Sequence, residues 1–194
     1  MTSRSDQLSN TQNKWLQTYF FIRAAGSVIW ILLAISIGKG NPTLAAILFV
    51  LYPAWDALAN FIDARRSGGL RQNPPQKFNF IVSVIVSLAI IGSLFAGIST
   101  TIKVFGVWAI FSGVLQLLAS ARRWKTSNGQ WPMILSGAQS CLAGLFMFNQ
   151  ASSDISLGVT TVVPYAAFGV FYFLIAAISL LIKNSRDNAK VAMR

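Results

Sequence analysis

Two ionisable side chains, Arg23 and Asp56, lie inside long apolar segments of the sequence. A charged side chain near the centre of a membrane-spanning helix costs at least about 2.5 to 3.5 kcal/mol, so each is expected to have a partner. At about 1.5 Å of rise per residue, both lie roughly 10 Å from the same end of their segments, and they can form a direct ion pair between adjacent antiparallel helices. In the alternative arrangement Arg23 extends to the lipid headgroups, and Asp56 remains hydrated near the interface.

Further polar residues occur at comparable depth. Tyr52, Asp56, Ala59, Asn60 and Asp63 recur at helical spacing, which predicts a polar stripe that faces neighbouring helices. The candidate intramembrane polar cluster consists of Arg23, Tyr52, Asp56, Asn60, Gln116 and Gln139. These residues could line a pocket open to the cytoplasm, but hydrogen bonding between helices is the commoner role of buried Gln and is the interpretation we favour.

The residue types argue against catalysis and metal binding. The chain contains no His and no Glu, and we find no paired carboxylates in a plausible site, so general acid–base chemistry lacks its usual groups. Cys141 is the single cysteine, which excludes an internal disulfide, and its apolar surroundings indicate a packing residue. We therefore expect no enzymatic activity, no catalytic residue, no cofactor and no bound metal.

The composition indicates a membrane protein. Of the 194 residues, 54% are hydrophobic and 11% are charged, whereas a soluble domain has about 25% charged residues. Since one span takes about 20 residues, six spans and two tails account for the whole length.

The apolar segments predict an all-α membrane protein with six transmembrane helices, both termini being cytoplasmic. The predicted spans are residues 15–37, 43–62, 78–97, 102–121, 131–149 and 159–182, which together form a transmembrane domain over residues 15–183. Residues 1–14 are polar and are expected to form a disordered cytoplasmic tail, and residues 184–194 a basic cytoplasmic tail. The first two spans are predicted to be joined by a tight turn at Gly38–Pro42 with Asn41 as helix cap, spans two and three by a long loop over residues 63–77, and spans three and four by a polar gap at Ser99–Thr101.

The distribution of charge predicts the orientation. Thirteen Lys and Arg residues fall on the side of the two tails and the two long loops, and only Lys39 and Lys103 fall on the other. Positive charge is retained in the cytoplasm, so we expect a multi-pass protein of the inner cell membrane. Although the net charge is +11, the charges lie in loops and not on one folded face, so the expected partner is the lipid bilayer and not nucleic acid. Homo-oligomerisation is left open, and the ligand is unknown.

Short motifs suggest an internal repeat. Ala-Arg-Arg occurs at residues 64–66 and 121–123, and Phe-Gly-Val at 105–107 and 168–170, at offsets of 57 and 63 residues. These offsets are the length of one helical hairpin and predict three αα-hairpin repeats. The alternative is that any series of apolar helices with basic ends looks repetitive.

Two segments, Phe105–Lys125 and Trp131–Phe148, resemble a family of short-repeat bacterial membrane proteins that includes the acid-resistance protein HdeD. The resemblance lies in hairpins with Gly-rich seams and Ala-Arg-Arg stops, and it implies this fold across nearly the whole chain but no catalytic motif. There is one departure from the repeat pattern. When spans two and four are aligned on their Ala-Arg-Arg motifs, Asp56 of span two corresponds to Gly113 of span four.

Small residues predict close helix contacts, at Ser136, Ser140 and Gly144 in span five and at Gly106, Ala109, Gly113 and Ser120 in span four.

The expected function is that of a non-enzymatic HdeD-like membrane protein that contributes to acid or envelope stress tolerance. The rival hypothesis is a small transporter or channel for protons or a small solute, which uses Asp56 and Arg23 and bends at Pro53.

Overall fold

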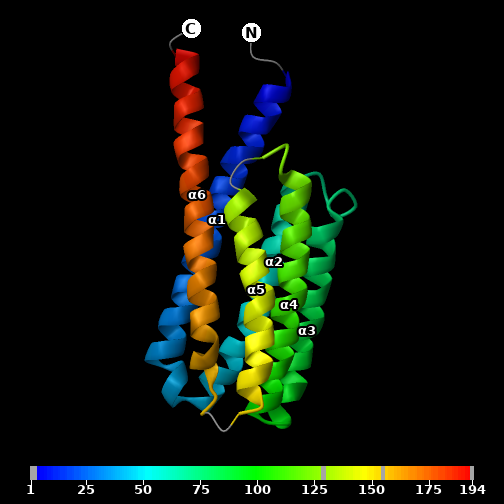
Figure 1. Ribbon diagram of the computed structural model, residues 1–194, viewed down its shortest axis with the longest axis vertical. Helices are drawn as coiled ribbons and strands as arrows, with labels where there is room; N and C mark the ends of the chain where they lie inside the picture. The colour runs from blue at the N-terminus through cyan, green and yellow to red at the C-terminus, as the bar shows by residue number, and fades with distance from the viewer. Residues whose placement is uncertain (1–3, 128–129, 154–155, 193–194) are drawn as a thin grey trace.

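Six long α-helices make up the molecule (Figure 1). The computed structural model describes residues 4–127, 130–153 and 156–192. Its helices are α1 (Arg4–Ser36), α2 (Pro42–Arg66), α3 (Pro74–Phe95), α4 (Ile98–Arg123), α5 (Gln130–Ala151) and α6 (Val163–Ala192), with short 3₁₀ segments at Gly38–Gly40 and Val159–Val162. The helices run alternately up and down, so that both ends of the chain lie at the same end of the bundle.

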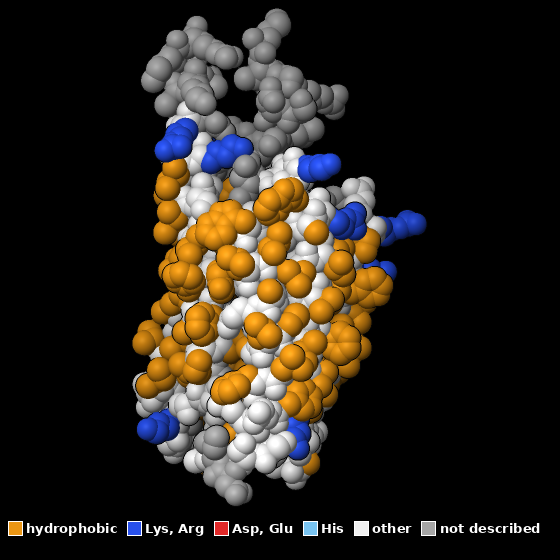
Figure 2. Space-filling view, in the orientation of Figure 1, with side chains coloured by type: hydrophobic (Ala, Val, Ile, Leu, Met, Phe, Trp, Pro, Cys, Tyr) orange, Lys and Arg blue, Asp and Glu red, His pale blue; other side chains and the backbone are white. Residues whose placement is uncertain are grey.

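The outer surface of the bundle is apolar. All six helices are long and apolar enough to cross a membrane, and side chains such as Leu88, Leu142 and Phe146 are largely exposed on them. Figure 2 shows hydrophobic side chains over the middle of the molecule and Lys and Arg side chains towards its two ends. The chain is therefore an all-α, multi-pass membrane protein, as predicted.

The helices pack as a closed ring in which each contacts its neighbours in sequence and α1 contacts α6. Packing is most extensive between α4 and α5, then between α1 and α6 and between α2 and α3, whereas α1 and α2 touch over a small area. The helices thus pack more extensively between hairpins than within them. The interior of the ring receives side chains from all six helices.

The first helix begins earlier than the sequence predicted. Residues 4–14 were expected to be disordered, but they are helical, and residues 1–3 lie outside the described part of the chain. The cause is tertiary: α1 packs along α6, Asn13 is buried, and the Asn184 amide donates to the Gln17 side chain at 2.8 Å. Likewise, the basic tail predicted over 184–194 continues α6 as far as Ala192. Local composition carries no information about such packing.

Two connections differ from the prediction. The expected polar gap at Ser99–Thr101 is the first turn of α4, and the turn lies instead at Ala96–Gly97, where Gly97 has a φ of +100°. The loop expected over residues 63–77 is confined to residues 67–73, since α2 runs on to Arg66 and α3 starts at Pro74. Basic residues and prolines are tolerated in terminal helical turns, which explains both longer helices.

The turn between α1 and α2 follows the prediction. The Asn41 side chain accepts a hydrogen bond from the Leu44 amide at 3.1 Å, and Pro42 occupies the first position of α2. The helix then continues through Pro53 to Arg66 without interruption.

A serine paired with an aromatic residue recurs in each hairpin, and two of the three pairs are hydrogen-bonded. The indole nitrogen of Trp108 donates to Ser83 Oγ at 2.9 Å, and the hydroxyls of Ser140 and Tyr165 are hydrogen-bonded at 2.9 Å. From one pair to the next, the serine and the aromatic residue each advance by 56 and then by 57 residues in the sequence. Within each pair, the aromatic residue follows the serine by 25 residues. The three pairs are Ser27–Tyr52, Ser83–Trp108 and Ser140–Tyr165. This pattern supports three hairpin repeats.

The pattern also corrects the alignment of the repeats. The second offset is 57 residues and not the 63 suggested by Phe-Gly-Val, and Asp56 corresponds to Ser112 and not to Gly113. Asp56 and Ser112 line the same internal cavity, whereas Gly113 faces α5. Short motifs of common residues, such as Ala-Arg-Arg and Phe-Gly-Val, could not distinguish these alternative alignments of the repeats.

Glycines form the contact between α4 and α5. A Cβ atom on Gly144 would lie 2.5 Å from the carbonyl oxygen of Gly106, and one on Gly113 would lie 2.6 Å from that of Gly137. Conversely, a Cβ atom on Gly106 would lie 2.9 Å from the carbonyl oxygen of Gly144, and one on Gly137 would lie 2.9 Å from that of Gly113. The seam predicted from small residues is therefore present, with Gly137 as an additional member.

Candidate functional site

Arg23 and Asp56 form a direct ion pair in the interior of the ring. The Arg23 Nη2 to Asp56 Oδ1 distance is 2.7 Å, and the side chains are 12% and 4% exposed. Arg23 also donates to the Tyr19 hydroxyl at 3.3 Å, and its guanidinium lies 4.6 Å from the centre of the Phe173 ring. The paired arrangement is thus present, and the alternative with Arg23 among the headgroups is not.

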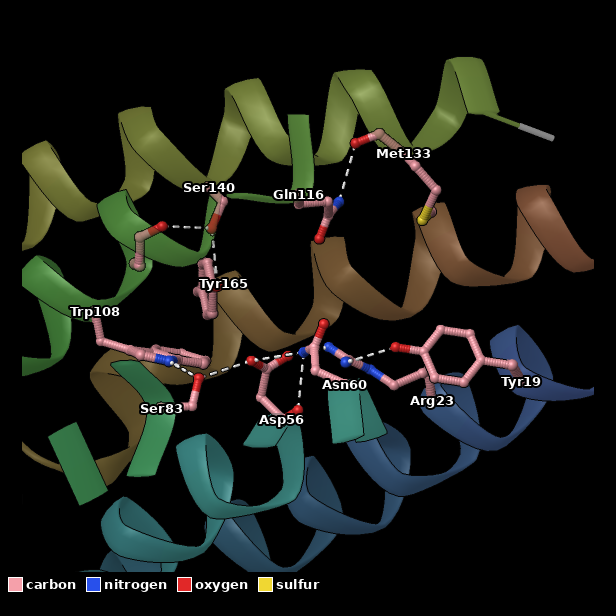
Figure 3. Close-up of polar contacts among 11 residues, drawn as sticks. Tyr19, Arg23, Asp56, Asn60, Ser83, Trp108, Gln116, Met133, Ser140 and Tyr165 are labelled. Carbon is pink, nitrogen blue, oxygen red and sulfur yellow. Dashed lines mark hydrogen bonds and ion pairs between the residues drawn. The ribbon is translucent and has the colours of Figure 1, made fainter. Parts of the chain in front are cut away.

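The second oxygen of Asp56 is held by neutral donors from two helices. Asn60 Nδ2 donates to Oδ2 at 3.1 Å and Ser83 Oγ donates at 2.9 Å, while Ser83 accepts from Trp108. Figure 3 shows this continuous network from Trp108 through Ser83 and Asp56 to Arg23. It joins helices α1 to α4, and hydrogen bonds to a charged group are about twice as strong as neutral ones.

A second buried ion pair lies closer to the basic end. Arg123 Nη1 and Asp63 Oδ2 are 2.8 Å apart, with side chains 12% and 3% exposed. Asp63 also accepts from Trp15 Nε1 at 3.1 Å and from Gln76 Nε2 at 3.4 Å. Both arginines in the interior therefore have an aspartate, and each aspartate has further donors.

A cavity of about 50 Å³ is lined by both ion pairs. Its walls come from all six helices and are mainly polar. They include Tyr19, Arg23, Asp56, Asn60, Asp63, Gln76, Asn79, Gln116, Ser120, Arg123 and Gln130. Since one water molecule needs about 10 to 15 Å³ of this kind of volume, the cavity has room for about three to five.

A smaller cavity of about 20 Å³ adjoins the first and shares Arg23, Asp56 and Gln116 with it. Tyr52, Gln139 and the Ser140–Tyr165 pair also line it. All six residues of the predicted polar cluster thus lie around these two cavities. They form one interior polar region that extends from the basic end towards the middle of the bundle.

The two glutamines have different surroundings. Gln116 Nε2 donates to the carbonyl oxygen of Met133 at 2.9 Å and so links α4 to α5, as the interhelical interpretation predicted. Gln139 lies between the smaller cavity and a separate groove of about 300 Å³ between α5 and α6, and Tyr165 lines both as well.

Aromatic side chains close the polar region on the side away from the termini. The rings of Tyr52, Trp108 and Tyr165 lie 5.7 to 6.1 Å apart pairwise, and Phe105 contacts all three. Beyond them is a buried apolar cluster that includes Trp30, Phe49, Ile90, Ile102 and Val162. The polar region therefore lies in the half of the interior near the termini, beside a second buried apolar cluster that includes Leu16, Phe20 and Leu180, and the other half is mainly apolar.

The donor set of this region suits hydrogen bonding. In the described residues, no group of three or more His, Cys, Asp or Glu side chains could hold a metal ion. Guanidinium, carboxylate, carboxamide and hydroxyl groups supply both donors and acceptors to a small polar molecule.

Sequence reasoning missed Arg123 and Ser83 as members of the site. Arg123 belongs to a basic run that the orientation rule already explained, and serine is common in membrane helices. The 25-residue spacing of Ser27, Ser83 and Ser140 to their aromatic partners is a signal that would have found Ser83.

Comparison with protein families gives a match over part of the chain. Residues 81–149 match the model of the DUF308 family, described as a short repeat of unknown function. The matched part runs from α3 through α4 into α5 and covers about a third of the chain. Searches of curated proteins and of solved structures found no match.

Proposed function

We propose that the chain is a non-enzymatic, HdeD-like protein of a bacterial inner membrane that contributes to acid or envelope stress tolerance. The observation that carries the non-enzymatic part is that Asp56 and Asp63 are each bound by an arginine and by neutral donors. Neither carboxylate is left as an acid or base beside a substrate. The match to a short repeat over residues 81–149 supports the HdeD-like part.

Charge supports the proposed orientation. The two chain ends lie at the same end of the bundle, and Arg65, Arg66, Arg122 and Arg123 end the helices that return to it (Figure 1). The other end has Lys39 and Lys103. By the positive-inside rule the end with the termini is cytoplasmic, and the partner of the apolar surface is the lipid bilayer.

The test measures survival of cells that lack the gene after an acid shock and after an envelope stress such as detergent. The native chain should restore survival, and so should the double variant Arg23→Gln/Asp56→Asn, because it removes both charges together and leaves neither unpaired. Arg122→Gln, which changes an exposed arginine, is the matched control. If the native chain has no effect on survival under either stress, the proposal is wrong.

A second candidate, a small transporter or channel for protons or a small solute, is favoured by the two adjoining cavities that Arg23 and Asp56 both line. Its test is proton or solute flux into vesicles that contain the purified chain. It predicts flux through the native protein and loss of flux in the double variant at equal protein content. Restored stress survival with the double variant, together with no measurable flux in the native chain, would exclude this candidate.

A further inference from the structure

Two buried polar atoms beside the larger cavity have no hydrogen-bond partner among the described residues. They are the side-chain oxygen of Asn79, a residue that is 5% exposed, and Nε of Arg23. Both residues line the cavity of about 50 Å³. Because buried polar groups in proteins are almost always hydrogen-bonded, an acceptor and a donor left open at one cavity indicate a bound molecule that supplies the complementary groups.

We infer that this cavity is a binding site for a small uncharged solute that carries both a hydrogen-bond donor and an acceptor, of the urea or short carboxamide class. The donor of the solute meets the Asn79 oxygen, and its acceptor meets Arg23 Nε. This inference does not depend on the proposed role in stress tolerance.

The size of the cavity limits the ligand. Room for about three to five water molecules corresponds to about four non-hydrogen atoms, which is the size of urea or acetamide. A sugar or a nucleotide is too large.

The charges around the cavity select an uncharged ligand. Arg23 and Arg123 are neutralised by Asp56 and Asp63 at 2.7 and 2.8 Å, so an ion would add a net charge to a buried site. The remaining polar walls are largely carboxamides, including Asn60, Gln76 and Gln130. These groups both donate and accept, which matches a planar amide or urea.

The test is equilibrium dialysis of the full-length chain in detergent against radiolabelled urea and acetamide. One saturable site per chain is expected. For a ligand of four non-hydrogen atoms, the tightest dissociation constant is on the order of tens of micromolar, and values up to a few millimolar agree with the inference. Acetate has the shape of acetamide and a negative charge, and it should bind at least about tenfold more weakly, because the site has no net positive charge to receive it.

Two variants test the site itself. Asn79→Leu removes the open acceptor, and Ala119→Leu fills the cavity from α4, so each should weaken binding at least about tenfold. Asn149→Leu makes the same change at an exposed position of α5 and should bind as the native chain does. Each variant is first checked for a single species by gel filtration and for native helix content, and if Asn79→Leu fails this check then Ala119→Leu decides.

Three results would overturn the inference. The first is that neither solute binds the native chain saturably, which would leave water alone in the cavity. The second is that the variants that fold bind the solutes with unchanged affinity. The third is that acetate binds as tightly as acetamide, which would make this an anion site.

Discussion

Asp63 of α2 and Arg123 of α4 form a buried ion pair, 2.8 Å between carboxylate oxygen and guanidinium nitrogen, at the end of the bundle that carries both termini. The same carboxylate accepts from Trp15 of α1 and Gln76 of α3. One acidic side chain thus links four helices of the ring. Closer to the middle, Asp56 links the same four helices through Arg23, Ser83 and Trp108.

Replacing Arg123 by Gln should destabilise the protein strongly. Asp63 would then remain buried without a counter-charge, and the loss of one partner of a buried pair costs about 3 to 5 kcal/mol. The measurement is thermal unfolding in detergent, followed by circular dichroism. The adjacent substitution Arg122→Gln is the control, because Arg122 is exposed and donates to the Gln72 carbonyl at 3.3 Å, and it should change stability by no more than about 0.5 kcal/mol. Equal effects of the two substitutions on thermal stability would show that the ion pair between Asp63 and Arg123 does not stabilise the protein.

The pair Arg23–Asp56 should show strong coupling in a double-mutant cycle. Arg23→Gln and Asp56→Asn each leave one buried charge uncompensated, at about 3 to 5 kcal/mol, whereas the double variant removes both charges and should recover much of that loss. Membrane levels and detergent thermal stability of the four proteins give the coupling energy. If the two single losses simply add in the double variant, the ion pair does not act as a unit.

Gly144→Ala should separate or distort the contact between α4 and α5. The added methyl would lie 2.5 Å from the backbone oxygen of Gly106 and 2.6 Å from Ile110 Cγ1, and overpacking of this kind costs about 1 to 3 kcal/mol. Gly92→Ala is the matched control, because nothing lies within 4 Å of its added methyl. Since alanine favours a helix by about 1 kcal/mol over glycine, the control should be neutral or more stable. Thermal unfolding that ranks Gly144→Ala with or above Gly92→Ala would contradict the seam.

The parts of the fold that sequence reasoning recovered depend on local signals. Hydropathy alone determines the six spans, and an asparagine before a proline determines the turn at Asn41 and Pro42. The pairing of Arg23 with Asp56 was also accessible, because two opposite charges at equal depth in consecutive antiparallel helices can meet whatever the order of the other helices.

The parts that sequence reasoning missed depend on how the helices are arranged in space. Asp63 and Arg123 come from helices that are not consecutive, so their contact follows from the ring and not from either segment alone. The helical residues 4–14 depend in the same way on the packing of α1 along α6, two helices that are far apart in the sequence. Motifs of two or three common residues were too weak to fix the second repeat offset, whereas the hydrogen bond between Ser140 and Tyr165 fixes it at 57 residues.

Ser83→Ala should be the most damaging of the three serine substitutions in the repeat. Ser83 is completely buried and holds two partners at once, since it donates to Asp56 and accepts from Trp108, both at 2.9 Å. Its removal takes one donor from a buried carboxylate and leaves the indole N–H without an acceptor, at about 1 to 3 kcal/mol for each group left unsatisfied. Ser27 and Ser140 contact a neutral tyrosine hydroxyl, and Ser140 also donates to the Ala109 carbonyl at 3.0 Å. Because neither serine bonds a charged group, Ser27→Ala and Ser140→Ala should cost less, about 1 kcal/mol each.

Ser36→Ala provides the control for this series, because Ser36 is exposed and bonds only its own helix, at the Leu32 carbonyl, and its loss should change stability by no more than about 0.5 kcal/mol. The expected order of unfolding temperatures is Ser36→Ala highest, Ser27→Ala and Ser140→Ala intermediate, and Ser83→Ala lowest. Loss of the Trp108 hydrogen bond should in addition alter its fluorescence in Ser83→Ala while the other three variants keep the native spectrum. An equal loss of stability in all four variants would mean that the repeated serines act only through general packing. It would also mean that the hydrogen bond from Ser83 to Asp56 adds nothing to the stability of the site.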